Sequence, residues 1–579
     1  MRRLRPKLPL IIKSGQLCSI EKKNILFGIS NILSSVLGVN MKKSKACLIS
    51  LDFYKAYDRV FLGFLLQVMA RMNFGPAFIS WVAMLHEGAQ TRFILDYLTE
   101  SIEVLFSIRQ GDPLAMLLYI IYVEPLLNAL ERNLVGLQFP KEIIEAYCDD
   151  INVMTSELGD FQIMAETVST FERFSGAILS RNNKCKVLGL GKWSGKQDWP
   201  LPWIQNVDSM KVFGIFITRS YNEILSLNWD FRLQKFNNAL MAWSTRMLGS
   251  LEQRIEIVKM FGLSRIYYVA SVLPIRSGVV KKIESIIGKF ICAKRGHNLR
   301  VALEDLKNNK LDGGLNLPCI ATMNKSLLSS QCVRLLRSGD TRSIAHLDIC
   351  MGALLSNIWP TLGLNADVFQ TPEYYSILGD CLATLMIDEI LTVSSIGTVT
   401  NRIIYKHFIA FNEPKIVRDN PGVNYSLVWK RLNSSAFLNL GDVHFLLIHN
   451  KLPVPERLNK TGYRNNPSCM FCPGAQPSDI VHYFCHCVRS RHCWSWIKRL
   501  LVSLSDKLAR SSDWELVNLA FPKNPNEMRI SWLVVSYVNF AWKEFLVRDT
   551  ALDFDSFFGF LKFKYKENAE SIGRISALE

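Results

Sequence analysis

Three aspartates at the ends of apolar segments constrain the fold of this chain more than any other feature. Residues 46–53 form an apolar run that predicts a buried strand, and Asp52 stands at its end. Residues 143–153 are apolar on both sides of Asp149 and Asp150, which predicts a β-hairpin with both acids at its tip. Aspartates on neighbouring strands supply the hard oxygen ligands that Mg²⁺ prefers. The pattern therefore predicts a sheet that gathers carboxylates around metal ions.

Metal ions held in this way suit phosphoryl transfer, because they bridge the attacking oxygen, the phosphate and the leaving group. Each acidic segment also has a simpler explanation when it is taken alone. A pair of aspartates is typical of a turn, and an aspartate between a strand and a helix is typical of a helix cap. A metal site is favoured only when both segments belong to one arrangement of motifs.

The size and charge of the chain indicate the class of its partners. Its 579 residues predict several domains, and 49% hydrophobic with 21% charged residues is typical of a folded protein. The formal net charge of +17 favours a polyanionic partner, either nucleic acid or an anionic membrane surface. Lysines scattered over the surface would give the same charge.

The N-terminal segment and the cysteines favour a reducing compartment. The basic residues 2–7 precede only a short apolar stretch at 8–12, which is too short for the core of a signal peptide. The longest apolar runs, such as 115–123, fall short of the roughly 20 residues that cross a membrane. Fourteen cysteines in so long a chain do not indicate a disulfide scaffold. We expect an intracellular protein of the nucleus or cytoplasm, with no membrane partner and with cysteines that are free thiols or metal ligands.

A helical region follows the acidic segments. Apolar residues recur every three or four positions from Trp229 to Met247, which predicts an amphipathic helix that ends near Gly249. Two further helices are expected over 251–273 and 279–291. They carry many lysines and arginines, which fit either a surface that grips a nucleic-acid duplex or solvated helix faces.

Five motifs stand in a fixed order over some 165 residues. They are Leu51–Val60, Ile108–Leu114, Ala146–Asp150, Phe174–Gly176 followed by Lys184, and Lys211–Ile215. In sequence and order they resemble the palm motifs of reverse transcriptases of LINE-type, non-LTR retrotransposons, and a looser similarity extends over nearly the whole chain. Ala115 stands where serine is common in that family, Cys148 where alanine is common, and Ser180 where asparagine is frequent.

The resemblance implies an α+β fold, with a right-hand polymerase palm and partial fingers, followed by a helical thumb and a mostly helical C-terminal region that contains a small zinc-binding segment. The boundaries we expect are partial fingers at 1–45, the palm with the catalytic core at 46–217, a thumb-like helical bundle at 218–300, a helical connector at 301–460, a CCHC zinc-binding segment at 461–500 and a C-terminal helical region at 501–579.

The resemblance also implies catalytic roles for the acids. Asp52 and Asp149 would be the primary ligands of two Mg²⁺ ions, with Asp150 as the supporting acid and the Phe53 carbonyl as a backbone ligand. Tyr57 would be the aromatic gate that leaves no room for a 2′-hydroxyl, so that deoxynucleotides are selected. The alternative for Tyr57 is an ordinary core aromatic on a helix face.

Further residues are implied to contact the incoming nucleotide. Gln110 and Gly111 would let the backbone approach the nucleotide and the template base, and Arg109 would support that loop or bind phosphate. Lys184 would protonate the pyrophosphate leaving group, although an ordinary surface lysine explains its position equally well.

A compact Cys/His segment predicts a second metal site. Cys469 and Cys472 have the C-x2-C spacing, His482 and Cys487 follow, and four such ligands suit tetrahedral zinc. The spacing resembles the C-terminal CCHC segment of non-LTR reverse transcriptases. Three other side chains compete for the fourth position, and a reduced, metal-free helical hairpin is the alternative. These competitors are Cys485, His486 and Cys493. Four nearby aromatics could stack bases beside the basic residues of that segment, although a small apolar core is the commoner role of such side chains. They are Tyr483, Phe484, Trp494 and Trp496.

The family resemblance implies an RNA-directed DNA polymerase that uses an RNA template, a DNA primer or target, and dNTPs, with other retrotransposon proteins as potential partners. Residues around Gln16 resemble the end of the family's fingers, so we expect a truncated element or a segment of a longer reading frame. A second hypothesis is a retrotransposon remnant that binds nucleic acid without catalysis. A third is a group II intron-type maturase, which the Cys/His spacing disfavours.

Overall fold

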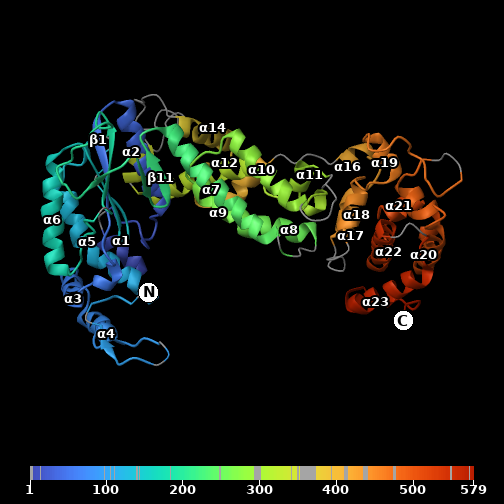
Figure 1. The fold of residues 1–579 in the computed structure, drawn as a ribbon, viewed down its shortest axis with the longest axis horizontal. Coiled ribbons are helices and arrows are strands. Elements are labelled where there is room, and N and C mark those ends of the chain that lie inside the picture. Colours follow the sequence, from blue (N-terminus) through green and yellow to red (C-terminus); the bar gives the residue numbers. More distant parts are fainter. Residues whose placement is uncertain are drawn as a thin grey trace. The chain divides into compact units, whose positions relative to one another are not determined.

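The computed structural model describes residues 4–578 except 13–14, 95, 97, 105, 110, 139–140, 143, 183, 245, 247–249, 293–300, 341, 348–350, 352–372, 393, 410–414, 434–440, 474–476, 548–550 and 573. The chain divides into two compact units. The first unit comprises Met1–Arg232, Ile266–Arg276 and Ala321–Phe408, and the second comprises Leu233–Arg265, Ser277–Ile320 and Ile409–Glu579. The ribbon is shown in Figure 1.

A five-stranded sheet forms the centre of the first unit. In spatial order its strands are β6 (Ile144–Tyr147), β7 (Asp150–Thr155), β1 (Lys45–Leu51), β8 (Lys186–Gly191) and β9 (Gln205–Asn206). The pair β8–β9 is parallel, and the other neighbours are antiparallel. The predicted strand and hairpin are therefore both confirmed, and β1, the first in sequence, lies between strands that follow it much later.

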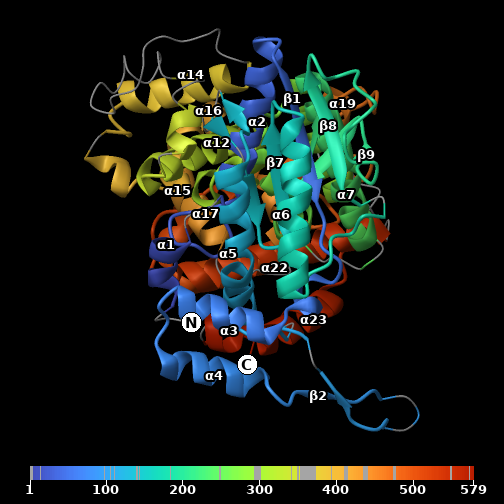
Figure 2. The ribbon, with the colours of Figure 1, turned by 90° about the vertical axis from the view of Figure 1, so that its left-hand side faces the viewer.

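Helices cover both faces of this sheet. Alternate residues of each strand point to opposite faces, so apolar residues on each side can pack against these helices. Cys47, Ile49 and Leu51 of β1 join one apolar core with α3 (Leu62–Arg71), α5 (Ala115–Asn133) and α6 (Gly159–Ser175). In Figure 2, α5 and α6 run in front of the strands. The helix α2 (Ile25–Met41) contacts β6 and β8. With apolar layers on both sides, the central strands are almost wholly buried.

Smaller elements complete the first unit. They are α1 (Leu8–Ile11), α4 (Pro76–His86), the two-stranded ribbons β2 (Gln90–Thr91) with β3 (Ile102–Glu103), β4 (Leu137–Gln138) with β5 (Lys141–Glu142), and β10 (Ser209–Val212) with β11 (Ile215–Thr218). A second apolar core joins α2 to α12 (Ile320–Ser338), α14 (Glu373–Ile387) and α15 (Asn401–Phe408).

The helices expected after the sheet are present with shifted boundaries. The first, α7, spans Tyr221–Ser244 and so begins before the periodic stretch, while the predicted end at Gly249 lies outside the described residues. The second predicted helix consists of three successive elements: α8 (Leu251–Ile257), a π-helical stretch (Val258–Leu263) and α9 (Ser264–Ala270). A capping box formed by Ser250 and Gln253 marks the start of α8. The third, α10, spans Ser277–Cys292.

The second unit is helical over its described residues. Its remaining helices are α11 (Leu303–Lys307), α16 (Lys415–Asp419), α17 (Tyr425–Leu432), α18 (Gly441–Ile448), α19 (Pro455–Lys460), α20 (Arg491–Leu504), α21 (Asp513–Val517), α22 (Glu527–Val547) and α23 (Phe554–Ile572). Most of the C-terminal ones contact α22, whose residues from Ile530 to Val538 are buried throughout. Among the described helices, none combines the length and the apolar character that crossing a membrane requires.

Candidate active site and metal cluster

The sheet register brings the three predicted acids together, and we call this group the carboxylate corner (Asp52, Asp149 and Asp150). In the antiparallel pair β1–β7, Leu51 lies opposite Ile151, so the next position sets Asp52 across from Asp150. Asp149 occupies the turn between β6 and β7. Burial raises the pKa of Asp149 and of Asp150, and the charge of the neighbouring carboxylates raises both further. The three negative charges therefore repel one another.

Asp52 carries the clearest sign that the corner is built for a cation. Its Oδ2 atom is buried and accepts no hydrogen bond. Lys184 Nζ lies 3.7 Å from that oxygen, but both side chains are substantially exposed, so solvent screens the ion pair. A buried carboxylate oxygen without a donor is costly. The residues of the corner thus fit a divalent ion, which would satisfy this oxygen and offset the repulsion.

The tip of the β6–β7 hairpin is held by Gln16, a side chain from the segment whose sequence resembles only the end of the fingers. Cys148 has φ +56°, a left-handed conformation that needs support in a residue other than glycine. Gln16, which is fully buried, provides that support: its Oε1 accepts from the backbone N–H of Cys148 and of Cys18, each at 3.0 Å. Its Nε2 donates to the Cys148 carbonyl at 3.3 Å. Neither the length nor the order of the sequence motifs predicts this contact between Gln16 and Cys148.

The first and second motifs meet beside the corner. Tyr57 stacks on Tyr119 with ring centroids 4.6 Å apart, and its carbonyl accepts from the Ile108 N–H at 2.9 Å. Arg109 is exposed on the loop that follows. Gly111 has φ +91°, and a Cβ atom added to it would meet no other atom within 4 Å, so the loop there has open space and a conformation that favours glycine. Gln110 lies outside the described residues.

The fourth motif pairs with the loop of the first. Gly176 ends α6 with φ +82°, and the chain then runs antiparallel to the residues after β1. The Ser180 N–H donates to the Asp52 carbonyl at 2.7 Å, and Phe53 forms a bridge with Leu179. The backbone on either side of Asp52 is thereby fixed by two elements, β7 and this segment.

The fifth motif is a tight hairpin that touches the third. Phe213 and Gly214 form the turn between β10 and β11, both with positive φ. The Phe213 ring packs edge-on against Tyr147, with centroids 6.3 Å apart, and the Tyr268 hydroxyl donates to the Phe213 carbonyl. All five motifs thus converge on one end of the sheet.

Four side chains of the second unit form what we call the Cys/His cluster (Cys469, Cys472, His482 and Cys487). Their ligand atoms all lie within 4.8 Å of one another. Cys487 Sγ is 3.8 Å from both Cys469 Sγ and Cys472 Sγ. Zn–S bonds of about 2.3 Å in a tetrahedron place two sulfurs roughly 3.8 Å apart. His482 Nε2 is buried without a hydrogen-bond partner, as expected for an atom that binds metal.

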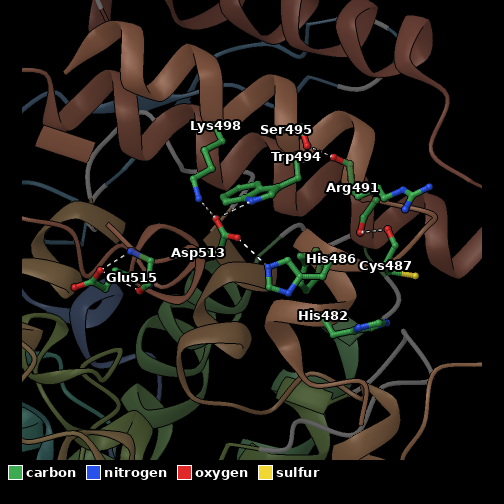
Figure 3. A network of polar contacts seen from close by, with 12 residues as sticks. His482, His486, Cys487, Arg491, Trp494, Ser495, Lys498, Asp513 and Glu515 are labelled. Atoms are coloured by element: carbon green, nitrogen blue, oxygen red, sulfur yellow. Dashed lines mark hydrogen bonds and ion pairs between the residues drawn. The ribbon is translucent and has the colours of Figure 1, made fainter. Parts of the chain in front are cut away.

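His482 belongs to the Cys/His cluster, whereas the competing histidine, His486, does not. His486 turns toward Asp513, which its Nε2 approaches to 2.9 Å (Figure 3). Asp513 also accepts from Trp494 Nε1 at 3.1 Å and Lys498 Nζ at 2.8 Å, and these donors lower its pKa despite burial. Cys485 and Cys493, the other two competitors, are buried and stand outside the cluster.

Of the two interpretations of the neighbouring aromatics, the small apolar core is the one that Phe484 and Trp494 fit. Phe484 and Trp494 are buried, and Trp494 packs against Tyr537 of α22. Trp496 meets three phenylalanine rings of α23. These rings join the core because they project from helix faces that α22 and α23 cover, which periodicity alone does not reveal.

Comparison with protein families agrees with this geometry. Residues 6–217 match the family described as "Reverse transcriptase (RNA-dependent DNA polymerase)", and residues 413–494 match "zinc-binding in reverse transcriptase". The first match covers the sheet, its helices and the whole carboxylate corner, and the second includes the Cys/His cluster. Residues 6–217 therefore form a reverse transcriptase domain.

Two relatives define the class more narrowly. The chain is 28% identical over 179 residues to "Transposon TX1 uncharacterized 149 kDa protein" of Xenopus laevis, covering 29% of this chain and 14% of the relative. It is 21% identical over 310 residues to "Retrovirus-related Pol polyprotein from type-2 retrotransposable element R2DM" of Drosophila melanogaster, covering 50% of this chain and 28% of the relative. Together with the domain matches, these relatives support a reverse transcriptase of the non-LTR retrotransposon type, and the matched parts of this chain span less than a third of either relative.

Two solved structures show a remote likeness to the chain. The telomerase of Candida tropicalis in complex with a fragment of telomeric RNA aligns with 60% of this chain and 55% of that chain, at 12% identity and a TM-score of 0.34. The telomerase of Candida albicans in a corresponding complex aligns with 60% of this chain and 52% of that chain, at 9% identity and a TM-score of 0.25.

Proposed function

We propose that the carboxylate corner catalyses RNA-directed DNA synthesis with two divalent ions. Asp52 and Asp149 would hold the ions and Asp150 would support them, and the bound ions would supply charge stabilisation for the attacking hydroxyl and the pyrophosphate leaving group. The observation that carries this proposal is the buried Asp52 Oδ2 without a hydrogen bond, set by strand register beside two acids of raised pKa. A cation would bind the Asp52 oxygen that lacks a hydrogen bond and would offset the negative charges of Asp149 and Asp150.

The residues around the corner would position the incoming nucleotide. The Phe53 carbonyl adds a backbone ligand, and Tyr57, held flat against Tyr119, presents its ring under the sugar and selects deoxynucleotides. Arg109 and Gly111 of the second motif would line the nucleotide, as would Gln110, which lies outside the described residues. In this proposal the substrates are an RNA template, a DNA primer or target end, and dNTPs, and the +17 charge favours such polyanions.

Lys184 is proposed to donate the proton that the leaving pyrophosphate needs. Its Nζ lies 3.7 Å from Asp52 Oδ2 and is exposed, so it can reach a bound nucleotide. A general acid contributes about 10²- to 10⁴-fold to a rate. Lys184→Ala should therefore lower kcat about 10²-fold, while Lys186→Ala, two positions further along the same segment, should have little effect. A less than threefold change in Lys184→Ala would show that Lys184 is an ordinary surface lysine.

The Cys/His cluster is proposed to bind one structural zinc ion through Cys469, Cys472, His482 and Cys487. Four protein ligands leave no open position, which is typical of structural rather than catalytic zinc. The three thiols come from two loops and the histidine from a π-helical turn, His482–His486. The ion would therefore link the loop that carries Cys469 and Cys472 to the π-helical turn.

A primer-extension assay tests the catalytic proposal. The full chain is incubated with a DNA primer annealed to RNA, dNTPs and Mg²⁺, and extension is expected for the wild type and for Asp58→Ala, whose exposed aspartate lies in the same motif. Asp149→Ala should abolish extension. Tight binding of the primed RNA without any extension by the wild type would instead support the nucleic-acid-binding remnant.

A further inference from the structure

Two buried thiols lie next to the carboxylate corner. Cys18 Sγ and Cys148 Sγ are 2.9 Å apart, although 130 residues separate them in the chain. Cys18 is fully buried and Cys148 is 6% exposed. Cys148 precedes Asp149 in the hairpin turn and replaces the alanine common at that position in the family. The proposed polymerase chemistry uses neither thiol.

The backbone pairing of two distant segments brings the two cysteines together. Gln16 and Ala146 form a parallel bridge, with Leu17 N–H donating to the Ala146 carbonyl at 2.8 Å. Two residues further on in each segment, Cys18 therefore stands beside Cys148. Neighbouring strands lie about 4.8 Å apart, and disulfides join Cα atoms about 4.4–6.8 Å apart. The bond can form without separating the two segments.

We propose that Cys18 and Cys148 form an oxidisable dithiol that links the redox state of the surroundings to the position of the catalytic hairpin. The oxidant is a hydroperoxide, which is small enough to reach the slightly exposed Cys148. The two thiols give up two electrons and two protons, and an Sγ–Sγ bond forms. The O–O bond of hydrogen peroxide breaks, and both oxygens leave as water. A dithiol reductant reverses the reaction by thiol–disulfide exchange.

Closing the bond would move the turn that carries Asp149. A disulfide is about 2.05 Å long, so the sulfurs must approach by about 0.9 Å from their separation of 2.9 Å. Cys148 directly precedes Asp149 in the turn, so a shift of Cys148 toward Cys18 would also displace the Asp149 backbone. Misplacing a catalytic group by about 1 Å costs roughly 10²-fold in rate. This consequence rests on the proposed polymerase function, whereas formation of the bond does not.

The test treats the zinc-loaded full chain with hydrogen peroxide. Free thiols are then alkylated, and peptides are mapped by mass spectrometry without reduction. The expected product is a linked peptide pair that contains Cys18 and Cys148, together with a loss of primer extension of about 10²-fold that dithiothreitol restores. Cys18→Ala should keep its activity under the same treatment. Cys332→Ala, which removes a buried thiol elsewhere in the same unit, should respond like the wild type.

Several results would overturn the proposal. One is equal inactivation of Cys18→Ala and wild type, and zinc release measured at the same time would then identify the Cys/His cluster as the oxidised site. Another is the absence of the linked peptide pair from wild type that extends primers when reduced. If reduced wild type extends no primer, the polymerase proposal fails separately, and the peptide map still decides whether the dithiol closes.

Discussion

The carboxylate corner and the Cys/His cluster both gather candidate metal ligands, but they do so by opposite routes. The acids of the corner come from segments far apart in the chain, and the register of β1 against β7 places them. The cluster takes all four side chains from the short stretch between Cys469 and Cys487. The corner is therefore shaped by a large apolar core, whereas the proposed zinc ion would link two short segments of the second unit. Metal loss should accordingly damage catalysis in the first and folding in the second.

The largest expected effect is loss of zinc. Structural zinc in small modules has an apparent binding free energy of about 10 kcal/mol or more. His482→Ala should abolish stoichiometric zinc binding and remove the hydrogen-exchange protection of residues 477–487. His486→Ala is the matched control, because His486 is bonded to Asp513 and should leave zinc content unchanged. Zinc is measured by atomic emission on the purified full chain. Retention of zinc by His482→Ala would contradict the proposed ligand set.

The second prediction distinguishes a catalytic role of Asp149 from a structural one. Asp149→Asn is expected to lower kcat about 10³-fold, or about 4 kcal/mol. The same variant should be at least as stable as wild type without Mg²⁺, because it removes one of three mutually repelling carboxylates. Thermal unfolding and primer extension are measured side by side, with Asp58→Asn as control. A marked loss of stability in Asp149→Asn would show that the acid is structural.

A smaller effect is expected where the corner depends on its support. Gln16→Ala leaves the backbone N–H groups of Cys18 and Cys148 without their partner, which should destabilise the first unit by about 2–3 kcal/mol. Because the hairpin tip also loosens, kcat should fall while KM for dNTP changes little. Gln162→Ala, at an exposed position on α6, serves as control. An unchanged kcat would mean that the tip keeps its position without Gln16.

The smallest expected effect is a loss of stability of the second unit at acidic pH, caused by a histidine outside the Cys/His cluster. Burial lowers the pKa of His444, on α18, to about 3. Its ordinary pKa in the unfolded chain is about 6.5, so the unfolded state binds the proton first and stability is lost as pH falls from about 6.5 toward 3. At pH 5 the loss is about 2 kcal/mol relative to pH 7.

Hydrogen exchange in α18 at pH 5 and pH 7 measures this loss. His444→Leu should show a smaller difference between the two pH values than wild type, with zinc content checked in both. An equal pH response in the variant and the wild type would place the acid-sensitive group elsewhere.

The approach of the three acids to one another could be predicted because the motifs are local patterns of sequence. Asp52, Asp149 and Asp150 stood out as acids at the ends of apolar runs, and each run formed the expected strand. The C-x2-C spacing likewise identified Cys469 and Cys472, since two ligands three residues apart in a loop can bind one ion. Local patterns of this kind survive because hydrophobic period and turn chemistry act over a few residues.

The remaining features depend on contacts between distant segments, which no local pattern encodes. Only the tertiary structure turned His486 toward Asp513 and left His482 in the cluster. Only the pairing of residues 15–18 with β6 placed Gln16 at the catalytic turn and Cys18 against Cys148. The sequence by itself determined which residue types could do the chemistry, and packing decided which of them meet, because burial and hydrogen bonding are settled by the whole core.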